Sequence, residues 1–234
     1  MMDYEKIQND TKRYIEPKSD NYIDLPNFDE SLHIVSEPSF DNLDIFEKAK
    51  VVSALVAFPR GKYLSKTNGT DHLSRTSPSG GARHPSELYL IVVESEFSGV
   101  YQVSIGTEDL RKISEAPTVE KLKKNIPGAF RLPVTPKLIF IVASDFERNM
   151  YRYREPRTFR TLFYYARHLG GLVESLMDTG NTISHGHQGF NDSYLQRIIS
   201  SESLASESPI YIISAGYRIA NSKELQVGKS FISK

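Results

Sequence analysis

The chain reads Arg75-Thr76-Ser77-Pro78-Ser79-Gly80-Gly81-Ala82-Arg83-His84-Pro85 and then, after Ser86, Glu87-Leu88-Tyr89-Leu90-Ile91-Val92-Val93. A loop of small residues therefore leads into a strongly apolar, β-prone run. Glycine has no Cβ, so the two glycines allow a flat ring or a phosphate to approach the backbone closely. The serines add hydroxyl donors, and the arginines and histidine add positive or titratable groups. This stretch predicts a cofactor pocket, built largely from main-chain N–H groups, ahead of a buried strand.

Further apolar runs complete the predicted sheet. Residues 87–94 lack polar alternation, which favours a strand buried on both faces. A turn at Ser98-Gly99 makes residues 100–104 the hairpin partner of that strand. Residues 137–144 form a second central strand, and residues 209–215 form the last. The sequence thus predicts three or four strands.

Five segments have helical patterns. The longest, residues 158–179, places apolar side chains three and four positions apart. Gly170-Gly171 inside it costs about 1 kcal/mol per glycine relative to alanine, so the pair indicates close approach of another helix or of a ligand. A helix over residues 41–58 is capped by Asp41 or Asn42. Shorter helices are expected at residues 109–114, 119–125 and 193–199, and residues 61–74 are expected to form a polar loop.

These elements predict an α+β domain over residues 42–220. Strands and helices do not alternate strictly, and neither GxGxxG nor GxxxxGK[ST] occurs, so a doubly wound nucleotide-binding sheet is disfavoured. Residues 1–41 are polar and spaced by prolines, and they are expected to form an extended N-terminal arm with little core of its own. Residues 221–234 form a C-terminal tail.

Composition narrows the function classes. Lys and Arg number 29, as do Asp and Glu, so no global field draws the protein to nucleic acid or to an anionic membrane. The absence of cysteine excludes disulfides, thiolate nucleophiles and Cys-ligated metals. The N-terminus does not read as a signal peptide, and no apolar run approaches the roughly 20 residues of a membrane helix. We expect a soluble, cytoplasmic protein.

The first stretch resembles the flavin-site segment of the SagB-type dehydrogenases, the FMN-dependent azoline oxidases of the nitroreductase superfamily. The matching pattern is Arg75-x-Ser77-Pro78-Ser79-Gly80-Gly81-x-x-His84-Pro85-x-Glu87-x-Tyr89. Later segments agree in order with the family's Lys-Tyr, Arg-Ala-Tyr-Arg, Gly-His and Gly-Gly-Phe-x-Asp motifs and with its closing strand. They are Arg152-Tyr153, Arg157-Thr158-Phe159-Arg160, His168, Gln188-Gly189-Phe190-x-Asp192 and residues 210–218.

The resemblance implies a nitroreductase-like α+β fold, with a central, mainly antiparallel sheet flanked by helices. It also implies a homodimer that binds FMN at the subunit interface. Members of this subgroup oxidise thiazoline or oxazoline rings in ribosomally made peptides to thiazoles or oxazoles. They usually work beside a cyclodehydratase and its partner proteins.

Two positions depart from the family pattern. The family commonly carries an Arg-Arg-Ser-x-Arg cluster that grips the FMN phosphate, whereas the equivalent residues 35–40 here contain no arginine. The lysine of the Lys-Tyr pair is replaced by Arg152, and an arginine stays protonated and cannot act as a base. Both changes weaken the expectation of full FMN affinity and of the usual catalysis.

Candidate roles follow from the chemistry that a flavin site needs. Residues Ser77 to Gly81 supply N–H donors to the ring, with a plain turn before a core strand as the alternative. Tyr153 relays the Cα proton, and Arg152 stabilises the phenolate. His84 is expected to lie beside the flavin or to have a structural role. The other predicted cofactor ligands serve the phosphate or allow close backbone approach, and each is otherwise an ordinary surface arginine or turn glycine: Arg75, Arg157, Arg160, Arg218, Gly189 and Gly216.

Two other motifs have simpler readings. The pair His185 and His187, two residues apart with no cysteine, is weak support for zinc, so we expect no metal site. The basic and aromatic stretch 150–157 is typical of peptide or RNA contacts, but the neutral overall charge argues against nucleic acid as the main ligand.

The sequence therefore favours an FMN-dependent azoline dehydrogenase within a peptide-modifying complex. Two alternatives stay open. One is a catalytically reduced scaffold subunit of such a complex, motivated by the two departures above. The other is a flavin reductase of the same fold that uses a nicotinamide to reduce a different substrate.

Overall fold

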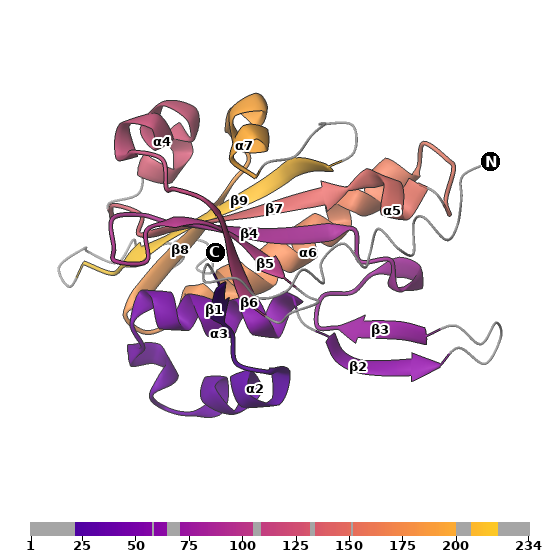
Figure 1. Ribbon diagram of the computed structural model, residues 1–234, viewed down its shortest axis with the longest axis horizontal. Coiled ribbons are helices and arrows are strands. Elements are labelled where there is room, and N and C mark those ends of the chain that lie inside the picture. The colour runs from indigo at the N-terminus through magenta and orange to yellow at the C-terminus, as the bar shows by residue number, and fades with distance from the viewer. Residues whose placement is uncertain are drawn as a thin grey trace, which may run out of the picture.

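A seven-stranded sheet forms the centre of the computed structural model (Figure 1). The structure describes residues 22–57, 59–64, 71–104, 109–131, 134–150, 152–199 and 207–219. The strand order is β1-β6-β5-β4-β7-β9-β8, every pairing is antiparallel, and β2 pairs with β3 in a separate hairpin. The strands are β1 Tyr22–Asp24, β2 Pro59–Leu64, β3 Asp71–Arg75, β4 Ser86–Val92, β5 Gly99–Ser104, β6 Asp109–Ser114, β7 Leu138–Asp145, β8 Thr182–His187 and β9 Glu207–Tyr217.

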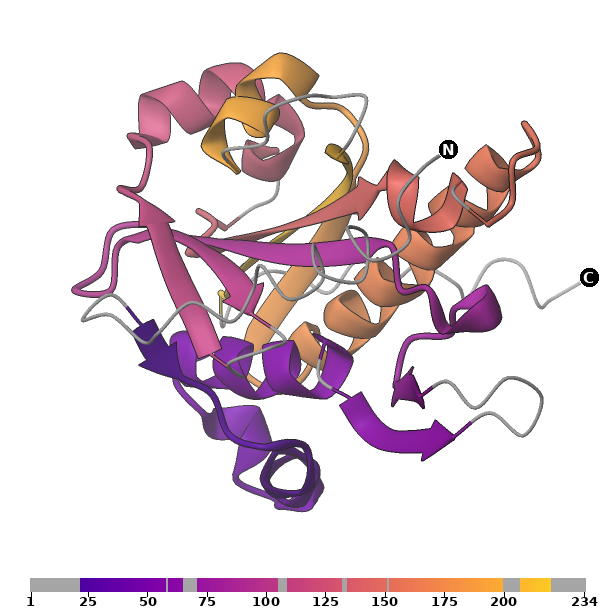
Figure 2. The ribbon, with the colours of Figure 1, turned by 45° about the vertical axis from the view of Figure 1, so that its right-hand side comes forward.

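Helices cover both faces of this sheet, so the predicted α+β fold with a mainly antiparallel sheet is confirmed. Helices α2, α3 and α6 lie on one face, and α4 and α7 lie on the other (Figures 1 and 2). The helices are α2 Phe28–Ser36, α3 Ile45–Ala57, α4 Val119–Asn125, α5 Phe146–Met150, α6 Thr158–Met177 and α7 Asp192–Ile198, with 3-10 turns η2 Phe40–Asn42, η3 Gly80–Ala82 and η4 Pro127–Phe130.

Strand β4 shows why the apolar run of the opening stretch is continuous. Its side chains alternate between two hydrophobic cores: Leu88 and Leu90 pack with α3 and α6, while Tyr89 and Ile91 pack with α4 and α7. Every residue of β4 is buried. Each fully buried aliphatic side chain contributes roughly 1.5–3 kcal/mol, so the prediction of a strand buried on both faces is confirmed.

The sheet has two ends that matter for function. Ser86 at the start of β4 pairs with Ser144, which in turn pairs with Ser208 on β9. We call this the bend end, because the glycine-containing loop precedes Ser86. Ala215 pairs with Leu138 at the opposite end. From Ser208 to Arg218 the chain runs ten residues, roughly 33 Å in extended conformation.

The structure corrects two predicted elements. Residues 109–114 form strand β6 and not a helix, because they pair with β5 on one side and with β1 on the other. A six-residue segment is too short to nucleate a helix without further support, whereas two strand partners satisfy its backbone. Residues 61–74 were expected to form a polar loop, but residues 59–64 and 71–75 pair as an antiparallel hairpin. Backbone hydrogen bonds hold this hairpin together, and a search for apolar side-chain patterns does not detect them.

The N-terminal region also differs from the expected extended arm. Strand β1 joins the edge of the sheet, and α2 begins with a capping box between Asn27 and Glu30. The predicted helix at 41–58 begins later, at Ile45, where the Asp44 carboxylate accepts the Phe46 amide at 2.8 Å. The expected caps at 41 and 42 lie in the 3-10 turn η2.

Other elements were absent from the prediction. The described residues contain nine strands where three or four were expected, and β8 and α5 were not anticipated. Predictions for residues 1–21 and 221–234 lie outside the described residues. No helix in the described part of the chain has both the length and the apolar composition needed to cross a bilayer.

Candidate functional site

The glycine bend, defined as residues 79–84, has the strained backbone of a built site. Gly81 has a φ of +66°, and Ala82 (+51°) and His84 (+44°) share this left-handed region. Residues with a Cβ rarely adopt it, and the surrounding structure must hold them there. The amides of Ala82 and His84 both donate to Ser79, to its carbonyl at 3.1 Å and its hydroxyl at 2.9 Å.

Both glycines face tyrosine hydroxyls, so neither position has room for a side chain. A Cβ on Gly81 would lie 2.8 Å from the Tyr153 hydroxyl, and one on Gly80 would collide with the Tyr165 hydroxyl. The Gly80 amide donates to the Tyr165 oxygen at 2.8 Å. The bend therefore presents a main-chain donor to an oxygen acceptor, as the sequence predicts for a ring-binding loop.

This donor set fits the polar edge of a flavin. Gly80 and Gly81 are exposed, so a flat ring could lie against them if it replaced the tyrosine hydroxyls. Behind the bend, Arg75 Nε and Ser86 Oγ are buried and have no hydrogen-bond partner among the described residues. The cavity between them measures about 10 Å³, enough for one water. A tricyclic ring therefore fits only on the outer side of the bend.

A basic pocket of about 290 Å³ adjoins the bend. Tyr153 and Tyr165 belong to it, and three arginines line it: Arg152, Arg154 and Arg157. Within the described part of the chain, none of these three arginines lies in an ion pair with a carboxylate. The pocket attracts anions because only one carboxylate, that of Glu155, lines it. Arg160 is exposed one turn further into α6.

Helix α5 places Tyr153. The amides of Arg152 and Tyr153 donate to the carbonyl of Asn149 at 3.2 and 3.0 Å. The Asn149 side chain donates to Thr161 Oγ1 at 2.9 Å, which ties α5 to α6. The predicted catalytic pair therefore lies on a short segment that is held at both ends.

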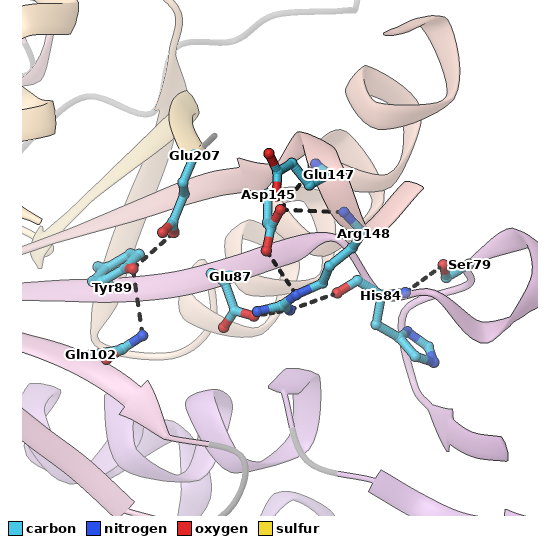
Figure 3. Close-up of polar contacts among 9 residues, drawn as sticks. All are labelled: Ser79, His84, Glu87, Tyr89, Gln102, Asp145, Glu147, Arg148 and Glu207. Atoms are coloured by element: carbon cyan, nitrogen blue, oxygen red, sulfur yellow. Dashed lines mark hydrogen bonds and ion pairs between the residues drawn. The ribbon is translucent and has the colours of Figure 1, made fainter. Parts of the chain in front are cut away.

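Behind the bend lies a cluster of buried charges (Figure 3). Figure 3 shows Arg148 between Glu87, Asp145 and the His84 carbonyl. Nearby, Tyr89 donates to Glu207 at 2.8 Å. Burial, with a smaller effect of Glu87, raises the pKa of Glu207 to about 7.

Burial shifts two other groups of this cluster. It lowers the pKa of Arg75 to about 10, although Glu87 acts in the opposite direction. It also raises the pKa of Asp145, against the favourable field of Arg148. Arg75 stays protonated at neutral pH. Its charge is opposed by the nearby Glu87 carboxylate, so Arg75, which was predicted to bind the phosphate, does not face an open anion site.

Arg218 and Gly216 lie at the opposite end of the sheet. Arg218 pairs with Asp178 at 2.9 Å, and both side chains are exposed. A Cβ on Gly216 would lie 3.0 Å from the Thr135 carbonyl, so protein and not ligand makes the close approach there. Within one protomer, these two residues do not join the glycine bend.

Gly189 borders a third region, an open groove of about 870 Å³ lined by residues 185–193 and by residues of α4 and η4. Nothing lies within 4 Å of a Cβ at Gly189, so no close approach requires this glycine. His187 Nε2 lies 2.7 Å from Ser214 Oγ. Burial, with a contribution from His185, lowers the pKa of His187 to about 4. Among the described residues, no group of three His, Cys, Asp or Glu side chains could hold a metal.

The glycine pair in α6 has a different explanation from the one expected. A Cβ on Gly170 would collide with the ring of Tyr211, a sheet residue on β9, so neither another helix nor a ligand approaches there. Sequence reasoning missed Tyr165, Arg148, Asp145 and Glu207. Tyr165 falls within the apolar pattern of residues 158–179, which gives it no separate signal, and no local sequence pattern shows that the three charged residues are buried.

Comparison with known proteins supports this reading of the fold. No protein-family model matches the chain. The chain is 33% identical over 112 residues to the trifolitoxin-processing protein TfxB of Rhizobium leguminosarum bv. trifolii. That match covers 42% of this chain and 28% of the relative's length.

Two solved structures share the architecture. A protein from Anabaena variabilis described as a nitroreductase matches with a TM-score of 0.65 and 22% identity over 86% of this chain and 39% of that one. The E. coli microcin synthetase McbBCD complex with truncated pro-MccB17 matches with a TM-score of 0.56 and 21% identity over 72% of this chain and 62% of that one. The chain has the nitroreductase fold, and the expectation drawn from the resemblance is confirmed at that level.

Proposed function

We propose that this protein is an FMN-dependent dehydrogenase that oxidises thiazoline or oxazoline rings in a ribosomally made peptide. The observation that carries the proposal is the glycine bend itself. Its exposed, side-chain-free backbone offers the Gly80 amide to an oxygen acceptor, and it adjoins the basic pocket that holds Arg152 and Tyr153. A planar, anionic cofactor meets both requirements.

The names of similar proteins support a role in peptide maturation. One relative processes trifolitoxin, and one structural neighbour is a microcin synthetase complex bound to a truncated peptide precursor. We therefore propose a modified peptide as substrate, and a cyclodehydratase with its partner proteins as the assembly in which the enzyme works.

A homodimer would complete the site. Counted along β9 from Ser208 at the bend end, the predicted ligands Arg218 and Gly216 lie roughly 33 and 26 Å away, so one protomer cannot bring them to the same FMN as the bend. A second copy, placed head to tail, can supply them. Helix α6 offers a surface for it, since Phe159, Phe163 and Tyr164 are 42%, 52% and 57% exposed.

The chain's own residues would then divide the work. Bound FMN supplies the two-electron acceptor. The Gly80 amide would hold the ring edge, and the cations of Arg157 and Arg160 would attract the phosphate. Tyr153, whose hydroxyl lies beside Gly81, receives the proton that leaves the substrate's ring carbon. Arg152 lines the same pocket and stabilises the negative charge on an ionised Tyr153.

A scaffold without catalysis is the second candidate, and a specific observation favours it. Tyrosine hydroxyls cover both glycines of the bend, and Arg152 cannot act as a base. In this case Tyr153 and Tyr165 would permanently occupy the site, and the protein would not bind flavin.

Absorption spectra separate the two. The proposal expects flavin bands in the purified protein, or their appearance after FMN is added and excess removed, followed by oxidation of an azoline-containing peptide. Tyr153→Phe should retain the flavin and lose at least tenfold in kcat.

A colourless protein that does not bind added FMN would support the scaffold, and unchanged turnover of Tyr153→Phe would remove the tyrosine from the mechanism. Bleaching of bound flavin by NAD(P)H, without peptide oxidation, would indicate a flavin reductase.

A further inference from the structure

The side chain of Arg148 joins parts of the chain that lie far apart in sequence. Its guanidinium pairs with Glu87 on β4, and its Nε lies 3.0 Å from Asp145 at the end of β7. The same guanidinium donates to the backbone carbonyl of His84 at 3.3 Å. A planar guanidinium can serve three acceptors together because its donors are fixed in a fork. The last residue of the glycine bend is thereby anchored to the sheet.

This anchor is buried. The side chain of Arg148 is 14% exposed, and that of Glu87 is 3% exposed. Removing one partner of such a pair leaves an uncompensated charge in the interior, so the two groups hold each other in place. The Asp145 amide adds a bond of 2.8 Å to the carbonyl of Pro85, which fixes the chain directly after the bend.

The backbone of the glycine bend is strained, so it needs stabilising contacts such as those of Arg148. Ala82 and His84 occupy a backbone region that side chains disfavour. Such conformations persist only where neighbouring groups hold them. Within the bend, Ser79 accepts from both residues, and Arg148 ties the His84 carbonyl to the sheet. Without the Arg148 contact, the strained backbone at His84 loses one of the interactions that stabilise it.

Arg148 also belongs to α5, the helix that contacts the other side of the site. Asp145 Oδ1 accepts the amides of Glu147 and Arg148 at 3.0 and 3.3 Å and so begins α5. The Asn149 carbonyl, one residue before the end of that helix, accepts the Tyr153 amide at 3.0 Å. The Tyr153 hydroxyl then lies beside Gly81.

We propose that Arg148, paired with Glu87, is a positioning residue that sets the place of the Tyr153 hydroxyl against the glycine bend. Its side chain fixes the bend at His84, and its helix accepts the Tyr153 amide at the Asn149 carbonyl, so both sides of the candidate site share one anchor. The role in catalysis rests on the proposed function. The clamp itself concerns only the described chain and can be tested without a cofactor.

The test compares Arg148→Lys with Arg167→Lys. Lysine keeps the charge beside Glu87 but is a compact ammonium that cannot match the three directions of the fork. Arg167 is a matched control because it makes an exposed pair with Glu174 at 3.2 Å on α6, outside the site. Hydrogen exchange is measured at the amides of Gly80, Ala82 and His84, and FMN affinity, bound-flavin absorbance, kcat and KM are measured on the full chain.

We expect Arg148→Lys to unfold cooperatively, with exchange at those three amides at least tenfold faster than in the wild type. FMN affinity should fall at least tenfold, the bound-flavin spectrum should shift, and kcat should fall more than KM rises. Arg167→Lys should match the wild type in every measurement. Wild-type exchange in Arg148→Lys, or an equal loss in the control, would overturn the proposal.

Two further outcomes are informative. If the wild-type protein binds no FMN, the proposed function fails, while the exchange measurements still decide whether Arg148 holds the bend. If Arg148→Lys does not fold, the double variant Glu87→Gln with Arg148→Gln replaces it, because it removes both charges of the Glu87–Arg148 pair and leaves only the partly exposed Asp145 carboxylate without its arginine. Faster exchange at the bend in that variant supports the clamp, and unchanged exchange overturns it.

Discussion

The two ends of the sheet hold arginine–carboxylate pairs of opposite character. At the bend end, Arg148 and Glu87 are almost fully buried. At the other end, Arg218 and Asp178 are 44% and 46% exposed, at a distance of 2.9 Å. A buried pair fixes geometry, whereas an exposed pair is weak and can exchange partners. The bend end is therefore built in advance, and the Arg218 end can release its arginine to an incoming phosphate or a second protomer.

Breaking each pair at its carboxylate is the strongest test of this contrast. Glu87→Ala removes one of the two carboxylates that pair with the buried Arg148 guanidinium and should lower the free energy of unfolding by about 3 kcal/mol, the low end of the range for a broken buried pair. Asp178→Ala removes an exposed partner and should cost less than about 1 kcal/mol. Urea unfolding monitored by circular dichroism measures both. Equal losses would show that the two ends do not differ in this way.

The buried carboxylates of the bend end should also make stability depend on pH. Burial and Glu87 raise the pKa of Glu207 to about 7 from 4.5, with Tyr89, Arg148 and Asp145 as its other neighbours. A raised pKa means that the folded state binds the proton more tightly. The stabilisation is complete below about pH 4.5, is lost as pH rises to about 7, and stays lost above it.

Glu207→Gln cannot ionise, and its side-chain oxygen can still accept from Tyr89. Relative to the wild type, it should therefore be more stable at pH 8 than at pH 5, by on the order of 2–3 kcal/mol. Urea unfolding at the two pH values gives this difference. A difference that does not change with pH would mean that Glu207 titrates normally.

The glycines offer a smaller comparison. Gly81→Ala places a Cβ at a φ of +66° and 2.8 Å from the Tyr153 hydroxyl, which should cost about 1–2 kcal/mol and weaken FMN binding. Gly189→Ala meets nothing within 4 Å, so its effect should stay within about 0.5 kcal/mol. Combining Gly81→Ala with Tyr153→Phe should recover part of the loss by removing the hydroxyl. No recovery would assign the whole cost to the backbone.

The sequence predicts correctly those elements whose pattern of apolar side chains alone shows which residues are buried. Strand β4 and helix α6 combine length with an apolar pattern that few other structures satisfy. Strand β6 and the β2–β3 hairpin depend on which neighbour offers a backbone ladder, and that information is distant in sequence. The short strand β1 is likewise defined by its pairing with β6.

The site was predictable where it is local. The bend and the Arg152–Tyr153 pair each lie within a few residues and can be read from one stretch. The ion pair of Glu87 with Arg148 joins residues 61 positions apart, and no short pattern shows that a polar residue is buried. Arg218 was grouped with the bend by family order alone, and the sheet places it at the other end.

His187 gives the smallest test, in the groove beside the exposed end. Its pKa is lowered to about 4 by burial and by His185, so the unfolded chain takes up a proton below about pH 6.5 that the folded chain resists. The stabilisation is present above that pH and declines as pH falls towards 4. Because the ring is half-exposed, solvent screening reduces the effect to about 1 kcal/mol between pH 7 and pH 5. The titrations of His187 and Glu207 cover nearly the same range, about pH 4 to 7, but with opposite sign. Relative to the wild type, His187→Gln should therefore lose less stability, and Glu207→Gln more, as the pH falls from 7 to 5. If both variants changed this pH dependence in the same direction, the two ends of the sheet would be electrostatically coupled, and the contrast between them would fail.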